Sequence, residues 1–418
     1  MEQFFMTNLA INKVRHLKDI SISLSKDQIK HLILTGKNGS GKTSVLEALA
    51  GYLNDGLSEN YFIDGEQGAK DFIIRDGESE FILQMMESSK PEERLYQYAK
   101  RLKKPSWGLN ALFNQSFMDF RILKKCHYIL AYYRADRIFE AEQPKHVEKI
   151  QLKDNYGITE SPRNEFVKYL LDLKMTEALA RNSKKTEKAD EIQTWFGNLE
   201  RLLKRIFEDE SIELAFDEDT FEFHILQQGK EPFDFNTLSS GYQAVLDIIL
   251  DLLMRMVSHT QRSFDFNLSG IVLIDEIETH LHLELQKNIM PLLNTIFPNI
   301  QFIVTTHSPF ILNSLENVVV YDLENHLLVE NGMNNLPYEG IVEGYFGADR
   351  MSDALRTKFE QYKNLVQKEK LSDDEISEIA ELELYLDEIP DYLAIGITTE
   401  YQRLKLEYMN REDIDGQN

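Results

Sequence analysis

Eight residues near the N-terminus have the types and the spacing of a phosphate-binding loop. The run Gly36–Thr43 reads Gly-Lys-Asn-Gly-Ser-Gly-Lys-Thr, which fits the pattern Gly-x-x-x-x-Gly-Lys-Ser/Thr. Glycines let the backbone curl around the β- and γ-phosphates of a nucleotide with its N–H groups turned inward. Lys42 then places a charge on the phosphates, and Thr43 offers its hydroxyl to Mg²⁺. The residues predicted to bind the nucleotide are Gly36, Asn38, Gly39, Ser40, Gly41, Lys42, Thr43 and Ser44.

Two carboxylates and a histidine farther along could supply the chemistry of phosphate hydrolysis. An apolar run ends in Asp275, which would orient the water shell of Mg²⁺, and Glu276, which would act as general base on the attacking water. A strand that simply ends in solvated acids is the plain alternative. His307 ends another apolar run, where it can donate a hydrogen bond to the γ-phosphate. The catalytic candidates are Glu276, Lys42 and His307, and the metal-binding candidates are Thr43 and Asp275.

A serine-glycine turn opens a strongly apolar predicted helix. Ser239, Ser240 and Gly241 precede the run 244–253, whose apolar residues recur at helical spacing. Such a turn can be a helix cap and nothing more. The first N–H groups of a helix also form an anion site, so these three residues are further candidates for binding phosphate.

The elements that must position these residues follow from the apolar pattern. Residues 31–34 predict a buried strand and 43–53 predict a helix, so the glycine loop joins a strand to the positive end of a helix. The runs that end in Asp275 and His307 predict two more strands, and 317–321 predicts another. The alternation of strands and helices indicates an α/β fold.

Three further segments complete the expected layout. Residues 164–206 predict a helical hairpin with its turn at 181–184. A β-hairpin that returns to the sheet is expected at 211–225, and the chain beyond 321 is expected to be helical and acidic, with a capped helix start at 371–375. The expected domains are an N-terminal lobe at 1–140, a helical insertion or lid at 141–210, a C-terminal lobe at 211–330 and an acidic helical region at 331–418.

The order of these motifs is that of an ABC-type ATPase, and the chain resembles the SMC, RecF and OLD superfamily. Residues 9–20 resemble the opening strand pair of that superfamily. Residues 275–282 resemble its combined Walker B and D-loop, with Leu283 where a proline is common. The runs 132–137 and 345–349 are similar to ATPases of bacterial anti-phage systems, most of all to the ATPase subunit of the Septu type.

The resemblance implies a fold and a set of partners. The fold would be an ABC ATPase head, a P-loop NTPase with a mixed central sheet, helices and an antiparallel β-subdomain, plus a short helical insertion and a helical C-terminal tail. ATP and Mg²⁺ would be the cofactors. The chain would form a homodimer or higher homo-oligomer through its ATP sites, in which Ser239–Gly241 face the phosphates bound by a second copy. Gln115 is a candidate for the Q-loop glutamine.

Composition limits the classes of partner. With 418 residues, 42% of them hydrophobic, the chain can bury a large core. It shows neither an apolar stretch long enough to span a bilayer nor a secretion signal, and its one cysteine, Cys126, excludes a disulfide framework, so we expect a cytoplasmic protein that does not bind membranes. A net charge of −24 opposes broad affinity for DNA.

Nucleic acid could therefore bind only at local basic patches. One is Lys100–Lys104 with Lys90, Arg94 and the following Trp107, and the other combines Arg181, Lys184, Lys185 and Lys188. A solvated helix face is the more ordinary interpretation of either run.

Three functions remain open from the sequence. The first is an ATPase that acts as sensor and scaffold and controls a separate effector, an HNH-type nuclease or a toxin, in anti-phage defence. The second is a RecF-like DNA-repair ATPase that binds DNA directly, and the third is a scaffold in which ATP is a structural staple with little turnover. Glu276 favours turnover, and the acidic charge with no long coiled coil favours the scaffold over the DNA clamp. We expect no nuclease activity in this chain, because its tail has neither a strand followed by Asp-x-Asp nor a Cys/His cluster.

Overall fold

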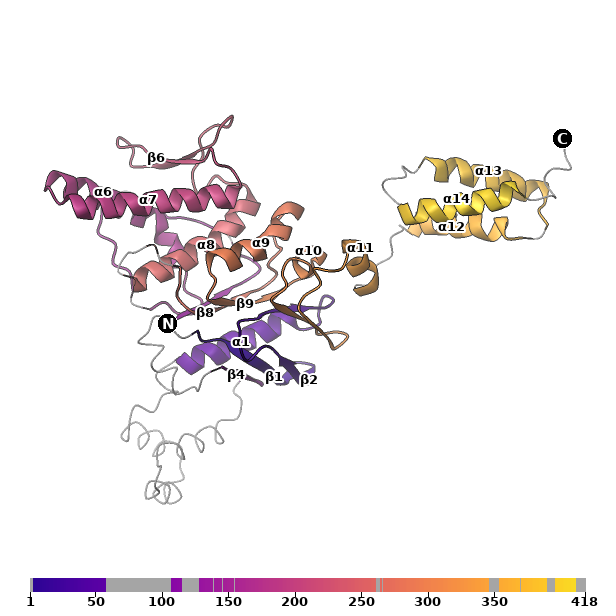
Figure 1. Ribbon diagram of the computed structural model, residues 1–418, viewed down its shortest axis with the longest axis horizontal. Helices are drawn as coiled ribbons and strands as arrows, with labels where there is room; N and C mark the ends of the chain where they lie inside the picture. The colour runs from indigo at the N-terminus through magenta and orange to yellow at the C-terminus, as the bar shows by residue number, and fades with distance from the viewer. Residues whose placement is uncertain are drawn as a thin grey trace, which may run out of the picture. The chain divides into compact units, whose positions relative to one another are not determined.

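The computed structural model in Figure 1 divides the chain into two compact units, Met1–Tyr338 and Glu339–Asn418. The sheets lie in the first unit, and a group of three helices makes up most of the second. The structure describes residues 3–57, 107–114, 128–137, 139–144, 146–153, 155–260, 264, 266–345, 353–368, 370–388 and 395–410.

A six-stranded sheet forms the centre of the first unit, in the order β11-β10-β3-β9-β8-β5. The bounds are β3 His31–Thr35, β5 Ile129–Tyr133, β8 Gly270–Ile274, β9 Ile300–Thr305, β10 Val318–Asp322 and β11 Leu327–Glu330. β11 pairs antiparallel with β10, and the other five strands pair in parallel. These five are buried along their whole length, as expected for a parallel sheet covered on both faces. Their carboxyl ends meet at one edge, where ligands of such sheets bind.

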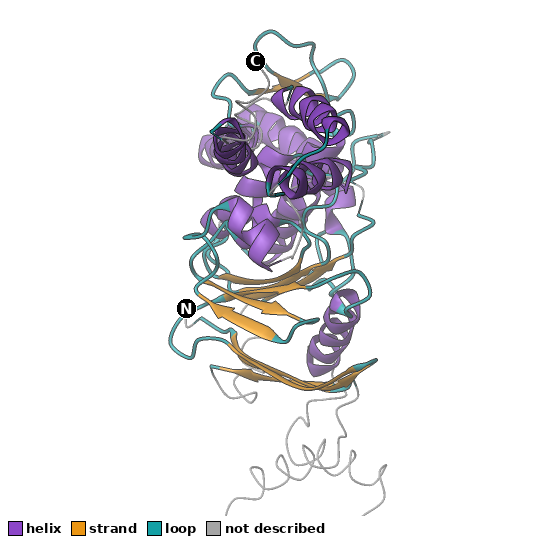
Figure 2. Ribbon diagram, turned by 90° about the vertical axis from the view of Figure 1, so that its right-hand side faces the viewer, coloured by secondary structure: helices purple, strands orange, loops and turns teal. Residues whose placement is uncertain are grey.

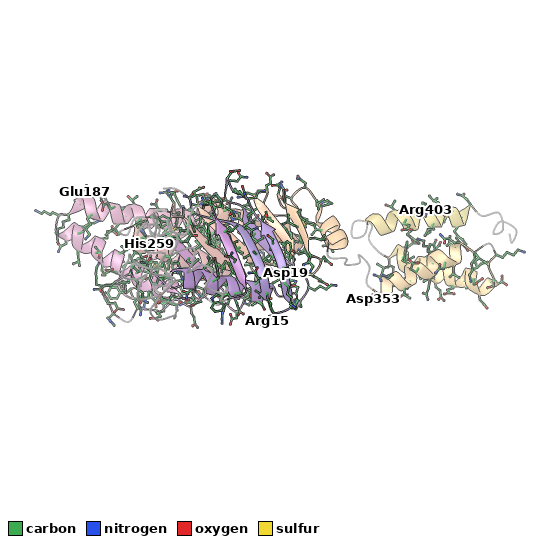
Figure 3. The ribbon with its side chains drawn as sticks, turned by 90° about the horizontal axis from the view of Figure 1, so that it is seen from below. Arg15, Asp19, Glu187, His259, Asp353 and Arg403 are labelled. Atoms are coloured by element: carbon green, nitrogen blue, oxygen red, sulfur yellow. The ribbon has the colours of Figure 1, made fainter. Side chains whose placement is uncertain are left out.

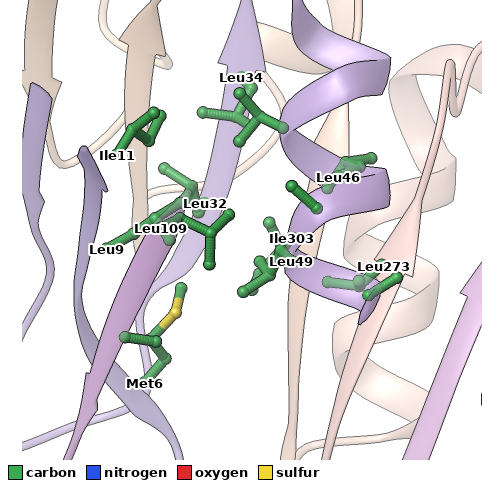
Figure 4. Packing of buried hydrophobic residues seen from close by; sticks show 14 of the residues in the cluster. Met6, Leu9, Ile11, Leu32, Leu34, Leu46, Leu49, Leu109, Leu273 and Ile303 are labelled. Atoms are coloured by element: carbon green, nitrogen blue, oxygen red, sulfur yellow. The ribbon is translucent and has the colours of Figure 1, made fainter. Parts of the chain in front are cut away.

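The predicted phosphate loop lies between β3 and helix α1 (Lys42–Leu57), and α1 lies between two sheets (Figure 2). On one side α1 contacts the antiparallel sheet β2-β1-β4, formed by β1 Met6–Val14, β2 Leu17–Ser23 and β4 Leu109–Phe113. On the other side it contacts β8 and β9. Figure 4 shows Leu46 and Leu49 of α1 in the resulting core, together with Leu9 of β1 and Ile303 of β9. This packing fixes the start of α1, and with it the loop.

The helical insertion forms the predicted hairpin. A short 3-10 turn η2 (Pro162–Glu165) leads into α6 (Phe166–Asn182), and α7 (Thr186–Phe207) returns beside it. Figure 3 labels Glu187, near the tip of this hairpin. On α7, the buried residues Trp195, Leu199 and Leu202 recur at helical spacing. The Trp195 ring packs edge-on against the ring of Tyr169 on α6, with the ring centroids 5.7 Å apart.

The β-hairpin that follows does not return to the central sheet, so that expectation was wrong. β6 (Glu213–Phe216) and β7 (Phe223–Leu226) pair with each other as a separate two-stranded sheet, and Ile225 of β7 also forms an isolated bridge with Phe233. The alternating pattern predicted the strands correctly but carries no information about which edge they join. Helices α8 (Ser240–His259), α9 (Leu283–Ile296) and α10 (Pro309–Leu312) complete the head.

The second unit begins within a short helical turn, α11 (Tyr338–Gly340), and continues through a π-helical turn, Ile341–Tyr345. Its main helices are α12 (Asp353–Val366), α13 (Asp373–Asp387) and α14 (Ile395–Met409), which share a small core around Phe359, Tyr362 and Leu404. Ser372 caps α13 as predicted, because its hydroxyl accepts the Glu375 N–H and the Glu375 carboxylate accepts the Ser372 N–H. β11 was not predicted, since the chain beyond 321 was expected to be helical.

Several predicted features lie outside the described residues. They are Lys90, Arg94, the basic run Lys100–Lys104, Gln115, Cys126 and most of 345–349. No helix in the described part of the chain combines the length and the apolar character needed to cross a membrane.

Candidate functional site

The loop after β3 has a backbone that glycine adopts more easily than any other residue. Gly36, Gly39 and Gly41 have φ angles of 132°, 85° and 98°. A methyl group on Gly36 would lie 2.9 Å from Ser40 Oγ and 3.2 Å from Asp322 Oδ1. On Gly41 it would come within 2.9 Å of a leucine on β2. The glycines are therefore required both for the curl of the loop and for the space around it.

Lys42 and Ser40 give this loop unsatisfied polar capacity. Lys42 is buried, and its Nζ donates to the carbonyl oxygens of Gly36 at 2.9 Å and Lys37 at 3.1 Å. Burial lowers the pKa of Lys42 below its usual value, and the charges of four nearby carboxylates offset only part of this effect. Ser40 Oγ is buried without a hydrogen-bond partner among the described residues. An ammonium bound to its own loop and an unpartnered hydroxyl are groups that a bound phosphate could satisfy.

The acid pair stands at the carboxyl end of β8 and is held by a threonine of β9. Asp275 is buried, and its Oδ1 accepts hydrogen bonds from Thr305 Oγ1 at 2.6 Å and Thr43 Oγ1 at 3.2 Å. The Glu276 N–H donates to Thr305 Oγ1 at 2.7 Å. Glu276 has a φ of 44°, in the left-handed region, and its Oε2 accepts a longer bond of 3.4 Å from Thr279. The Asp275 carboxylate therefore accepts from Thr43 and Thr305, whereas the Glu276 carboxylate accepts from Thr279.

His307 follows β9 and keeps one ring nitrogen without a partner. The backbone N–H of His307 donates to Glu278 Oε1 at 2.6 Å. Nε2 of the ring is buried and has no hydrogen-bond partner in the described structure. Burial, and then the charge of Lys42, lower the pKa of His307, which favours a neutral ring with one N–H and one acceptor nitrogen. This is the donor capacity that a terminal phosphate requires.

The structure brings the phosphate loop, Asp275, Glu276 and His307 together, but Ser239–Gly241 belong to different surroundings. Gly241 packs near Leu285 and the carbonyl of His280, and within the described residues no hydrogen bond joins the three residues to the phosphate loop. Ser239 occupies the N-cap position of α8, yet its side chain makes no capping bond. Both serines are exposed. The expected capped start is therefore correct in position, and the hydroxyls remain available to a ligand.

A pocket of about 480 Å³ opens beside the loop. Its size is within the range of nucleotide and other small-molecule sites. One wall is fixed by Lys37, which pairs with Glu324 at 2.9 Å and donates its backbone N–H to the same carboxylate at 3.1 Å. The lining residues are His16, Leu17, Lys18, Lys37, Asn38, Ser40, Leu323, Glu324 and His326.

The predicted metal site fits Mg²⁺ in its donor types. Thr43 Oγ1 and Asp275 Oδ1 lie 3.2 Å apart, and Mg²⁺ is usually bound by one or two such protein oxygens together with phosphates and water. The part of the chain that the structure describes contains no group of three or more His, Cys, Asp or Glu residues able to hold a metal ion. Any Mg²⁺ at this loop would therefore share its coordination with the nucleotide.

Four contributors to the site were not predicted. Thr305 and Glu278 hold predicted residues, Glu324 fixes the loop, and Arg137 binds the backbone after β8. Thr305 and Glu278 adjoin predicted motifs, so proximity in sequence could have suggested them. Glu324 had no local signal, because β10 is adjacent to β3 only in the folded sheet.

Similarities to known proteins agree with this layout. A family model described as "AAA domain, putative AbiEii toxin, Type IV TA system" matches residues 32–313, more than half of the chain. The retron Ec83 probable ATPase of Escherichia coli is 36% identical over 143 residues, which cover 33% of this chain and 26% of that protein. Septu protein PtuA of Bacillus mycoides (strain KBAB4) is 25% identical over an alignment that covers 96% of this chain and 53% of that protein. The chain thus spans between a quarter and about half of the length of these relatives.

Two solved structures are among those that align with this chain. The SMC head domain from Thermotoga maritima gives a TM-score of 0.35 at 13% identity, covering 78% of this chain and 97% of that one. The protein cbiO1 from Clostridium perfringens, part of the ABC transporter complex cbiONQ, gives 0.35 at 14% identity, covering 85% and 94%. The α/β class of the head follows from its strand order and from the helices between its strands. Because the family model covers most of the head, the chain belongs to the AAA-domain family described as "putative AbiEii toxin, Type IV TA system".

Proposed function

We propose that the chain is an ABC-type ATPase that binds ATP with Mg²⁺, closes as a homodimer or higher homo-oligomer around the nucleotide, and hydrolyses it. The observation that carries this proposal is the gathering of Lys42, Thr43, Asp275, Glu276 and His307 at the carboxyl edge of one parallel sheet. No other set of described side chains combines a phosphate loop with a general base and a metal-binding pair.

Each side chain then has a distinct task. Lys42 exchanges the carbonyls of Gly36 and Lys37 for phosphate oxygens. Bound Mg²⁺ would neutralise phosphate charge, with Thr43 and Asp275 holding its water shell. Glu276 orients the attacking water and accepts its proton. The unpartnered Nε2 of His307 is placed to donate to the terminal phosphate in the N–H tautomer.

The separation of the two halves of the site supports the proposed dimer. Ser239 and Ser240 are exposed at the start of a 20-residue helix, and the free N–H groups of its first turn attract an anion. Since these residues have no bond to the loop of their own chain, we assign them to the phosphates held by a second copy. ATP would then join the two heads.

The biological role is proposed from the relatives and the charge. The names of the Septu and retron relatives support a role in anti-phage defence, with this ATPase as sensor and scaffold for a separate effector, an HNH-type nuclease or a toxin. A DNA clamp is less well supported, because the described basic patch is partly neutralised. Arg181 pairs with Glu177 at 3.1 Å and with Asp190 at 3.3 Å.

The decisive experiment compares wild type with Glu276→Gln and Lys42→Ala. Wild type should release phosphate from ATP in the presence of Mg²⁺, Glu276→Gln should bind ATP and remain dimeric without turnover, and Lys42→Ala should bind no nucleotide. Phosphate release, nucleotide titration and light scattering measure the three properties. Turnover by Glu276→Gln at the wild-type rate would contradict the general-base assignment.

The effector can be sought with the same trapped variant. Tagged Glu276→Gln isolated from its host with ATP should carry a nuclease or toxin at fixed stoichiometry, identified by mass spectrometry. Recovery of DNA without a companion protein would instead favour the repair clamp.

A further inference from the structure

Arg137 binds three consecutive carbonyl oxygens at the turn that carries the proposed general base. It is buried and follows β5, next to β8 in the sheet. Its Nη1 donates to the carbonyl oxygen of Asp275 at 2.9 Å, and its Nη2 donates to the carbonyl oxygens of Ile277 at 3.0 Å and Glu276 at 3.3 Å. Nη1 also donates to the carbonyl oxygen of Arg134 at 3.1 Å, and this bond connects the turn to the end of β5. A planar guanidinium with several N–H groups can make this pattern, and an ammonium cannot reproduce it.

The turn held by Arg137 has a backbone that needs external support. Glu276 has a φ of 44°, which a residue with a side chain adopts only when its surroundings fix it. Its N–H is bound by Thr305 and its carbonyl by Arg137, so the peptide groups on both sides of Glu276 are restrained. The direction of a side chain is set by its backbone, and the aim of the Glu276 carboxylate therefore depends on these two contacts.

A buried acid compensates the charge of Arg137. Asp247 of α8 is fully buried, and its charge is the strongest of the electrostatic influences that raise the pKa of Arg137 against the lowering effect of burial. Asp247 also forms an ion pair with Arg163 of η2. The ion pair with Arg163 keeps Asp247 from being an isolated buried charge. The bonds to backbone carbonyls fix the geometry of Arg137.

We propose that Arg137 is a positioning residue for ATP hydrolysis: it holds the turn 275–277 so that the Glu276 carboxylate reaches the attacking water. This inference rests on the proposed ATPase function. It predicts an effect on the chemical step rather than on nucleotide binding, because Arg137 makes no described contact with the phosphate loop. A displacement of about 1 Å at such a group can reduce turnover about 100-fold.

The test is Arg137→Lys, which keeps the positive charge beside Asp247 and loses the three-carbonyl contact. We expect a kcat about 100-fold below wild type, with the Kd for ATP within about threefold of wild type. The matched control is Arg255→Lys. Arg255 is equally buried, pairs with Asp251 at 2.7 Å and donates to the carbonyls of Leu130 and Gly157, but it does not contact the catalytic turn. Its kcat should stay within about threefold of wild type.

The outcomes separate the positioning role from a purely structural one. A kcat of Arg137→Lys near wild type, or an equal fall in kcat for Arg255→Lys, would overturn the proposal. If Arg137→Lys does not fold, Arg137→Gln leaves the Asp247–Arg163 ion pair intact and should show the same split between kcat and Kd. A folded Arg137→Gln variant with wild-type turnover would also overturn the proposal. Absence of turnover in wild type would instead show that the proposed ATPase function has failed.

Discussion

Acid should weaken the head through one buried histidine, His31 of β3. The His31 ring is fully buried, its Nδ1 accepts the Phe302 N–H at 3.1 Å, and its Nε2 lies 3.0 Å from Asn294 Oδ1. Nδ1 must be unprotonated to accept that bond, so Nε2 carries the proton and donates to Asn294. Protonating the ring would place a charge in the core and break the bond from Phe302. Burial accordingly lowers the pKa of His31 from 6.5 to about 4.

The magnitude and sign follow from this shift. The folded state binds the proton less readily than the unfolded chain, so the stabilisation is complete above pH 6.5 and is lost as the pH falls towards 4. A pKa shift of this size contributes about 3 kcal/mol in full to the free energy of unfolding. About 2 kcal/mol of this contribution should be lost between pH 7 and pH 5.

The assay is urea unfolding at pH 7 and at pH 5, followed by tryptophan fluorescence and circular dichroism. His31→Gln can keep an acceptor for Phe302 and a donor for Asn294 but does not titrate, so the free energy of unfolding should depend less steeply on pH than in wild type. His146→Gln is the control, because the His146 side chain is 72% exposed. It should retain the wild-type pH dependence.

Equal pH dependence in wild type and His31→Gln would refute the reasoning. If His31→Gln does not fold, NMR of labelled histidine rings in wild type decides the question. A His31 ring that remains the neutral Nε2–H tautomer at pH 5 supports the argument, and a ring that is protonated at pH 5 contradicts it.

The remaining predictions concern single contacts. Gly36→Ala should weaken ATP binding in calorimetry, because its φ of 132° is strained for alanine and the new methyl group would lie 2.9 Å from Ser40 Oγ. Ser240→Arg should leave ATP binding intact but prevent dimerisation by light scattering, since the exposed helix start would be blocked. Thr305→Val should lower both kcat and stability, the latter by about 1–3 kcal/mol in denaturant titration, because Asp275 and Glu276 lose a shared partner. Ser372→Ala should destabilise α13 by about 1 kcal/mol, seen as faster hydrogen exchange there.

The sequence predicted the elements of the site better than their arrangement. The strand–loop–helix around Lys42 and the strand that ends at Asp275 were recognisable, because glycine spacing and buried apolar runs are local signals. The neighbours of these strands were not recognisable. β10 lies beside β3 and provides Glu324 close to the loop, although the two strands are far apart in the chain.

The unpredicted parts share a physical cause. β11 is a short edge strand of four residues whose sequence, Leu-Leu-Val-Glu, does not alternate, and the β6–β7 hairpin could satisfy its alternation without joining the central sheet. Arg137 lies in a run that resembled other ATPases, but its contacts are to backbone carbonyls, which every residue possesses. Contacts to backbone carbonyls do not depend on the residue types of the partners, so the sequence gives no sign of them.

The strand order also sets when the head can form during synthesis. β3 has β9 on one side and β10 on the other, so the strand that precedes the phosphate loop has both of its neighbours only once residue 322 has been made. At about 5–20 residues per second, the ribosome needs roughly 15–60 s to progress from β3 to β10. During this interval an apolar strand lacks one or both of its neighbours in the sheet, and such high contact order slows folding and favours aggregation. Production of this ATPase should therefore depend on chaperones and improve when translation slows or temperature falls.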